Sequence, residues 1–106
     1  MKLSEVSRLL CTAQECNTIE DYLAECGGSL PDDSYYDHAD KAIETLKVLY
    51  ACRDGVNIQT LLALHGGGVT GFRKEYGLPK QTLWNWMTGH NAPPQYVLRL
   101  ILADLI

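Results

Sequence analysis

Three side chains that form directional hydrogen bonds, Lys80, Gln81 and Asn85, lie within six residues near the C-terminal end of the chain. Residues one helical turn apart share a face, so a helix would present these groups together. Lys can donate to guanine, and Gln or Asn can form two hydrogen bonds with adenine. The segment therefore has the chemistry to contact DNA base edges, although a solvated helix face would have a similar composition.

The flanking residues predict a helix over Lys80–Thr88. Pro79 suits the first turn of a helix and Gly89 suits its left-handed end. The buried face is expected to carry three apolar side chains, Leu83, Trp86 and Met87. The outward face is expected to carry polar groups and a second tryptophan, which are Lys80, Gln81, Trp84, Asn85 and Thr88.

Residues 72–98 follow the pattern F-x-x-x-Y-G-L-P-x-x-T-L-x-x-W-x-x-G-x-x-x-P-P-x-Y-V-L. This pattern resembles the lambda-repressor-like (Xre/Cro-type) helix-turn-helix family, and the resemblance covers about residues 57–106. It implies that helix 80–88 enters the major groove of double-stranded DNA. The residues it places toward bases are Lys80, Gln81, Trp84 and Asn85, and those it places toward phosphates are Thr70, Lys74 and His90.

Two places depart from the family pattern. Gly68-Val69 stands where the family usually has Thr-Gln, whose Gln holds a backbone phosphate. Arg73 stands where the family prefers a small residue at the crossing of the two helices. We expect the Arg73 stem to lie along that crossing with its charge in water.

Charge is distributed unevenly along this acidic chain, which has a net charge of −4. Residues 1–55 hold five basic and eleven acidic side chains, net −6, whereas residues 56–106 hold four basic and two acidic ones, net +2. DNA affinity depends on Lys and Arg neutralising phosphates. We therefore predict an acidic region over 1–55 for dimerisation or partner binding, and a DNA-binding domain over 56–106 whose weak affinity a homodimer would raise.

Helical periodicity predicts an all-α fold of about six to seven helices, with a C-terminal helix-turn-helix and an N-terminal helical extension. Three helices are expected in the first 55 residues. Ser4 should cap the first, which carries Val6, Leu9, Leu10 and Ala13, and Thr18 should cap the second, which ends at Gly27. Pro31 should open a third, longer helix. Arg53 is expected in the last turn of the third helix. Asn57 should cap a fourth helix over 58–64.

The last predicted helix, over 94–106, is apolar on most faces. Such a helix is expected to be buried on several sides, either by the N-terminal helices or by a second copy of the chain. Gly66-Gly67-Gly68, upstream of the motif, is the only stretch that resembles a linker.

Sequence features of enzymes and metal sites are missing. The cysteines form no CxxC pair and the histidines no HxxxH pair, so neither a metal site nor a cofactor is expected. The acidic residues over 32–40 are expected at the start of a helix, where negative charge is favourable, and so need no catalytic role. His65 is interpreted as a residue at a helix end and not as a general base. No apolar run is long enough for a membrane span or a signal peptide, so a cytoplasmic protein is expected.

The sequence therefore predicts a sequence-specific transcriptional regulator, of repressor or antitoxin-like type, that is not an enzyme. The alternative is an adaptor or inhibitor that keeps the helix-turn-helix fold but binds a protein through Trp84 and the acidic N-terminal helices. Salt separates the two hypotheses, because DNA affinity falls steeply with salt whereas an apolar contact centred on Trp84 barely responds.

Overall fold

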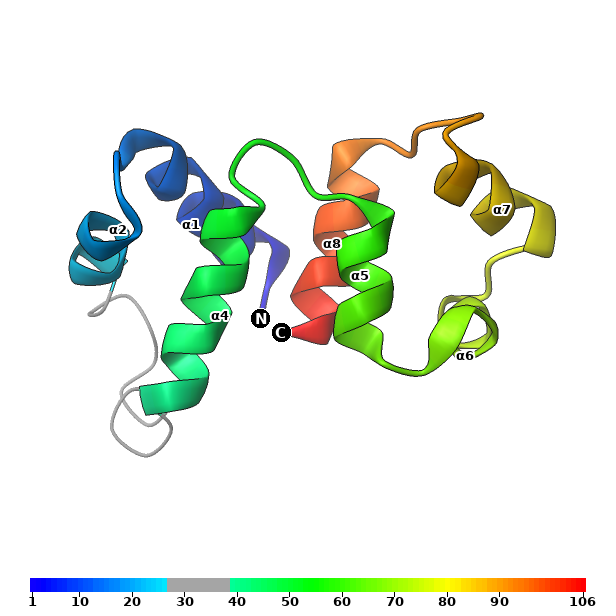
Figure 1. Ribbon diagram of the computed structural model, residues 1–106, viewed down its shortest axis with the longest axis horizontal. Coiled ribbons are helices and arrows are strands. Elements are labelled where there is room, and N and C mark those ends of the chain that lie inside the picture. Colours follow the sequence, from blue (N-terminus) through cyan, green and yellow to red (C-terminus); the bar gives the residue numbers. More distant parts are fainter. Residues whose placement is uncertain (27–38) are drawn as a thin grey trace. The chain divides into compact units, whose positions relative to one another are not determined.

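The computed structural model describes residues 1–26 and 39–106, and in these residues it contains seven helices and no strand (Figure 1). The predicted all-α fold of six to seven helices is confirmed. The chain divides into two compact units, residues 1–55 with 106 and residues 56–105. Across the described ranges, the helices are too short or too polar to cross a membrane.

The N-terminal unit is built on α1 (Leu3–Glu15), α2 (Ile19–Cys26) and α4 (Ala39–Ala51). α4 packs against both α1 and α2, and α1 also packs against α2. The Tyr22 ring is fully buried among these helices, and its hydroxyl donates a 3.0 Å hydrogen bond to the Leu9 carbonyl. The other large buried side chains of this unit are Val6, Leu9, Leu10, Leu46 and Leu49.

Helix ends in this unit agree only partly with the predictions. Ser4 does not cap α1, because the helix already begins at Leu3 and has Lys2 at the N-cap position. Thr18 caps α2 as predicted, since its Oγ1 accepts the Asp21 N–H at 3.2 Å. The predicted end at Gly27, the start at Pro31 and the acids from 32 to 37 lie outside the described residues.

Arg53 is not in the last turn of the third predicted helix, because α4 ends at Ala51. It follows the helix and folds back over it. Its guanidinium donates to the Tyr50 carbonyl at 3.0 Å and lies 4.2 Å from the centre of the Tyr50 ring. The cation thus still meets a carbonyl at the helix C-terminus, where positive charge is favourable.

The C-terminal unit contains α5 (Ile58–His65), α6 (Gly68–Tyr76), α7 (Lys80–Thr88) and α8 (Gln95–Leu105). α5 is its central helix and packs against α6, α7 and α8. The side chains buried in this unit are Val56, Ile58, Leu61, Phe72, Leu83, Leu98, Ile101, Leu102 and Ala103. The predicted cap of α5 is confirmed, since Asn57 Oδ1 accepts the Thr60 N–H at 2.8 Å.

α8 is less enclosed than its composition predicts. Leu98 and Leu102 are buried, but Tyr96 and Leu100 are exposed, so only part of its apolar surface is covered. Gln95, the first residue of α8, forms hydrogen bonds with Val56, the first residue of the C-terminal unit. The Gln95 amide accepts the Val56 N–H at 2.9 Å and donates to the Val56 carbonyl at 3.0 Å.

The glycines at 66–68 form a tight turn between α5 and α6, and not the linker that their sequence resembles. Gly66 ends α5 in the left-handed conformation with φ of 74°, and α6 begins two residues later. Gly67 donates its N–H to His65 Nδ1 at 3.2 Å. A Cβ at Gly67 would lie 2.7 Å from His65 Cε1, so a side chain at this position would force the His65 ring to move.

Candidate functional site

α6, a three-residue turn and α7 form the part of the chain that the sequence singles out. Gly77 ends α6 with φ of 64°, and the following Leu78 N–H donates to the Arg73 carbonyl at 3.0 Å. Pro79 is extended and immediately precedes α7, which ends at Gly89 with φ of 82°. The predicted bounds of Lys80–Thr88 are therefore confirmed, since Pro79 and Gly89 impose them locally.

One face of α7 is fixed by the core. Leu83 is 1% exposed, as predicted, whereas Trp86 is only half-buried. Met87 was expected on the same face but is 37% exposed. It lines a pocket on the surface instead, because the buried stripe of α7 is narrower than the apolar pattern suggests.

The opposite face of α7 presents two amides that are already bonded to each other. Gln81 Nε2 donates to Asn85 Oδ1 at 3.0 Å, as residues four apart on a helix can do. Gln81 is exposed and Asn85 is half-buried. The bond holds the two groups in a common orientation, which lowers the conformational entropy that they would lose on binding.

Trp84 projects from α7 with 49% of its surface exposed. Its ring centroid lies 5.2 Å from that of His90, and Thr88 Oγ1 lies 3.1 Å from His90 Nδ1. Thr88 also donates to the Trp84 carbonyl at 2.9 Å. His90, predicted to contact phosphate, is thus held beside the tryptophan at the end of the helix.

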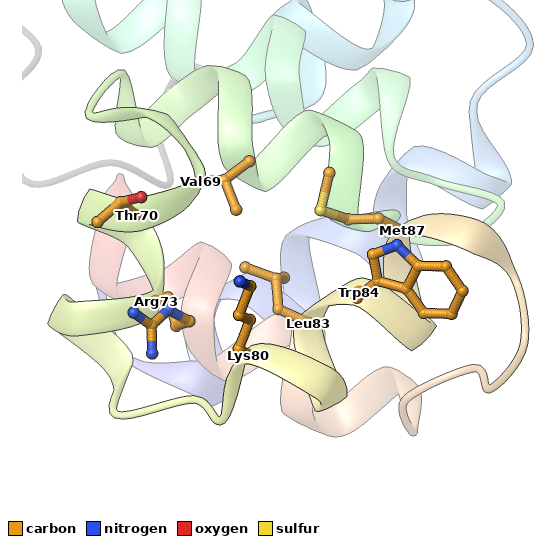
Figure 2. Close-up of a pocket in the computed structure, with 7 residues that line it drawn as sticks. All are labelled: Val69, Thr70, Arg73, Lys80, Leu83, Trp84 and Met87. Atoms are coloured by element: carbon orange, nitrogen blue, oxygen red, sulfur yellow. The ribbon is translucent and has the colours of Figure 1, made fainter.

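A pocket of about 270 Å³ opens between α6 and α7 (Figure 2). Its lining residues come from both helices and are Val69, Thr70, Arg73, Lys80, Leu83, Trp84 and Met87. The structure thus brings together three of the predicted DNA contacts, Thr70, Lys80 and Trp84. Lys74 is exposed on α6 and does not line the pocket.

Arg73 is a pocket residue that the sequence interpretation missed. Its stem was expected along the crossing of α6 and α7, and the residue is half-buried and lines the pocket between these two helices. Val69 and Met87 were missed as well. Their spacing carried a usable signal: Val69 and Arg73 are four apart on α6, and Trp84 and Met87 three apart on α7, so each pair shares a helix face.

The basic side chains here are not neutralised by neighbouring acids. Within the described parts of the chain, Arg73, Lys74 and Lys80 form no ion pair. The two carboxylates of the C-terminal unit are engaged elsewhere. Glu75 lies 3.5 Å from His65 Nε2, and Asp104 accepts the Tyr76 hydroxyl at 2.8 Å.

All four cysteines are free thiols. Burial raises the pKa of the Cys26 and Cys52 thiols, which favours the unreactive neutral form. No group of three metal-ligating side chains occurs among residues 1–26 and 39–106. Comparison of the chain with protein-family models, with curated proteins and with solved structures found no match.

Proposed function

We propose that the protein is a sequence-specific DNA-binding transcriptional regulator, of repressor or antitoxin-like type, that inserts α7 into the major groove. The observation that carries this proposal is the exposed polar face of α7, where Gln81 is bonded to Asn85 and Lys80 lacks an ion-pair partner. An α-helix with its side chains is about 10–12 Å in diameter, which suits a major groove about 12 Å wide.

Each polar group of this face has a matching partner on a base edge. The amides of Gln81 and Asn85 suit adenine, which offers one acceptor and one donor in the major groove, and Lys80 suits the acceptors of guanine. A good pair discriminates against the wrong base by about 1–3 kcal/mol. The exposed Trp84 would add an apolar contact to a thymine methyl group or a sugar.

Thr70, Lys74 and His90 are proposed to contact phosphates on either side of the inserted helix. The net charge of +2 over residues 56–106 allows only a few phosphates to be neutralised. A homodimer that occupies two half-sites about 34–36 Å apart would compensate for this weak affinity. The acidic N-terminal unit is the proposed site of dimerisation or of a protein partner.

The exposure of Trp84 and Met87, at 49% and 37%, favours a second candidate function. Large apolar side chains in contact with water commonly mark protein interfaces. The same face would then bind a protein, and the molecule would act as an adaptor or inhibitor together with its acidic N-terminal helices. Such binding depends little on salt, whereas DNA binding falls steeply with it.

Selection from a random pool of double-stranded DNA with the full chain, at low and at moderate salt, tests the proposed function. We expect enrichment of one motif, and we expect Gln81→Ala and Asn85→Ala to lose it. Failure to enrich any motif, or weak binding that both variants retain in full, would contradict base recognition by α7.

A further inference from the structure

The pocket between α6 and α7 has its charged lining residues on one side and its apolar lining residues on the other. In Figure 2, Lys80 and Leu83 lie between Arg73 on one side and Trp84 and Met87 on the other, with Val69 above them. Positive charge therefore gathers on the Arg73 side of the pocket and apolar surface on the Trp84 side. Among the described residues, none of those that line the pocket is acidic.

The apolar part of the pocket is incompletely covered. Six large apolar side chains are exposed over residues 56–105, and three of them line this pocket. These are Val69, Trp84 and Met87, which are 45%, 49% and 37% exposed. Their exposure is concentrated around one hollow, whereas single exposed apolar side chains are normally scattered. A ligand with an apolar body would remove this surface from water.

The charged part of the pocket also lacks a partner within the C-terminal unit. Arg73 and Lys80 form neither an ion pair nor a side-chain hydrogen bond there, and both carboxylates of the unit bond elsewhere. An arginine fork beside a lysine ammonium suits a carboxylate, because charge-assisted hydrogen bonds to both cations can form at once. The pocket thus complements an anion that is attached to an apolar group.

We propose that this pocket binds a small organic acid, with one aromatic ring or branched aliphatic group and one carboxylate. The carboxylate lies between Arg73 and Lys80, and the apolar group lies against Leu83, Trp84 and Met87. The volume of about 270 Å³ equals that of roughly nine water molecules, which accommodates a single ring and its carboxylate.

Such a ligand would cover Lys80 and Trp84, two of the residues proposed to contact bases. Binding of the acid and binding of DNA would therefore exclude each other, and the acid would act as an effector that releases the protein from DNA. This regulatory consequence rests on the proposed function. Binding of the acid itself does not rest on it.

Nuclear magnetic resonance titration of the ¹⁵N-labelled full chain tests the pocket, with phenylacetate as the probe and phenylacetamide and acetate as controls. The readout is the Trp84 indole N–H resonance, assigned by its loss in Trp84→Phe. We expect saturable shifts with phenylacetate and binding at least about tenfold weaker for both controls, since the amide lacks the charge and acetate lacks the ring.

Arg73→Gln and Lys80→Gln should each weaken phenylacetate binding by about tenfold, whereas Lys74→Gln, which makes the same charge change outside the pocket, should not. The proposal is overturned if phenylacetamide binds as tightly as phenylacetate, or if Lys74→Gln has the same effect as the pocket variants. It is also overturned if no member of a panel of aromatic and branched aliphatic carboxylates shifts Trp84 in the millimolar range.

A competition measurement separates this proposal from the proposed function. With both correct, phenylacetate weakens DNA binding by the wild-type chain but not by Arg73→Gln. Saturable shifts without any DNA binding would leave the pocket established and the proposed function wrong. DNA binding without such shifts would leave the proposed function intact and the pocket proposal wrong.

Discussion

The Tyr76 hydroxyl donates a 2.8 Å hydrogen bond to Asp104 and so links the last residue of α6 to α8. The Tyr76 ring also packs on Phe72, with ring centroids 4.9 Å apart. Burial, together with the bond to Asp104, raises the pKa of Tyr76 to about 12. This contact anchors the C-terminal end of α6 before the turn into α7.

We expect alkaline pH to weaken this link. The folded-state pKa of Tyr76 is about 12, above the value near 10 of an unfolded tyrosine, so its contribution to stability is complete below pH 10. That contribution should disappear as pH rises from about 10 to about 12. Urea unfolding of the wild type and Tyr76→Phe measures the difference. The free energy of unfolding of the wild type should exceed that of Tyr76→Phe by about 0.5–1 kcal/mol below pH 10, and this difference should close as pH rises to about 12. A difference that does not depend on pH would contradict the prediction.

Asn57 caps α5, the central helix of the C-terminal unit, through bonds to the Thr60 N–H and hydroxyl. Asn57→Ala should lower the free energy of unfolding by about 1 kcal/mol. Asn57→Asp is the matched control. It keeps the acceptor and places a negative charge at a helix start that has no acid in its first turn, so it should be at least as stable as the wild type. Equal loss in both variants would argue against the cap.

Leu83 and Met87 lie on the same helix, four residues apart, but only Leu83 is buried. We expect Leu83→Ala to cost about 2–5 kcal/mol through the cavity it leaves. Met87→Ala should change stability by less than about 1 kcal/mol, because its surface already contacts water. Thermal and urea unfolding measure both. Comparable losses would place Met87 in the core and would remove it from the pocket.

Lys74 is an exposed cation of α6 proposed to contact a phosphate. Lys74→Gln should weaken binding to selected and random DNA by similar factors, and it should reduce the slope of log affinity against log salt by about 0.9. Lys41→Gln makes the same charge change on α4, in the N-terminal unit, and should leave the slope unchanged. Fluorescence anisotropy over a salt series gives both slopes. An unaltered slope in Lys74→Gln would exclude this phosphate contact.

The elements predicted well from the sequence are those whose ends depend on local chemistry. Pro79 and Gly89 bound α7 through their own backbone preferences, and Asn57 and Thr18 cap helices through bonds three residues away. Ser4 is a plausible cap, but Lys2 occupies that position because α1 begins two residues earlier than the polar residue suggests. Local signals of this kind determine helix ends to within a turn.

The pocket could not be predicted in the same way, because it depends on how α6 and α7 are each placed against α5. Periodicity places Met87 on the apolar face of α7 but cannot give the width of the stripe that α5 covers. It also cannot show that Arg73 on α6 and Lys80 on α7 line the same hollow. The residues of the two helices come together only in the tertiary structure.

Base recognition by α7 is tested most directly by the ratio of affinities for the selected DNA site and for the same site with one base pair changed. The wild type should prefer the selected site at the position that Gln81 reads by about 5- to 150-fold, equivalent to 1–3 kcal/mol. Gln81→Ala should lose that preference at this position alone, while Gln59→Ala, an exposed glutamine of α5, should retain it in full. If Gln81→Ala and Gln59→Ala keep the wild-type ratio at every position, α7 does not read DNA through this residue and the account is wrong.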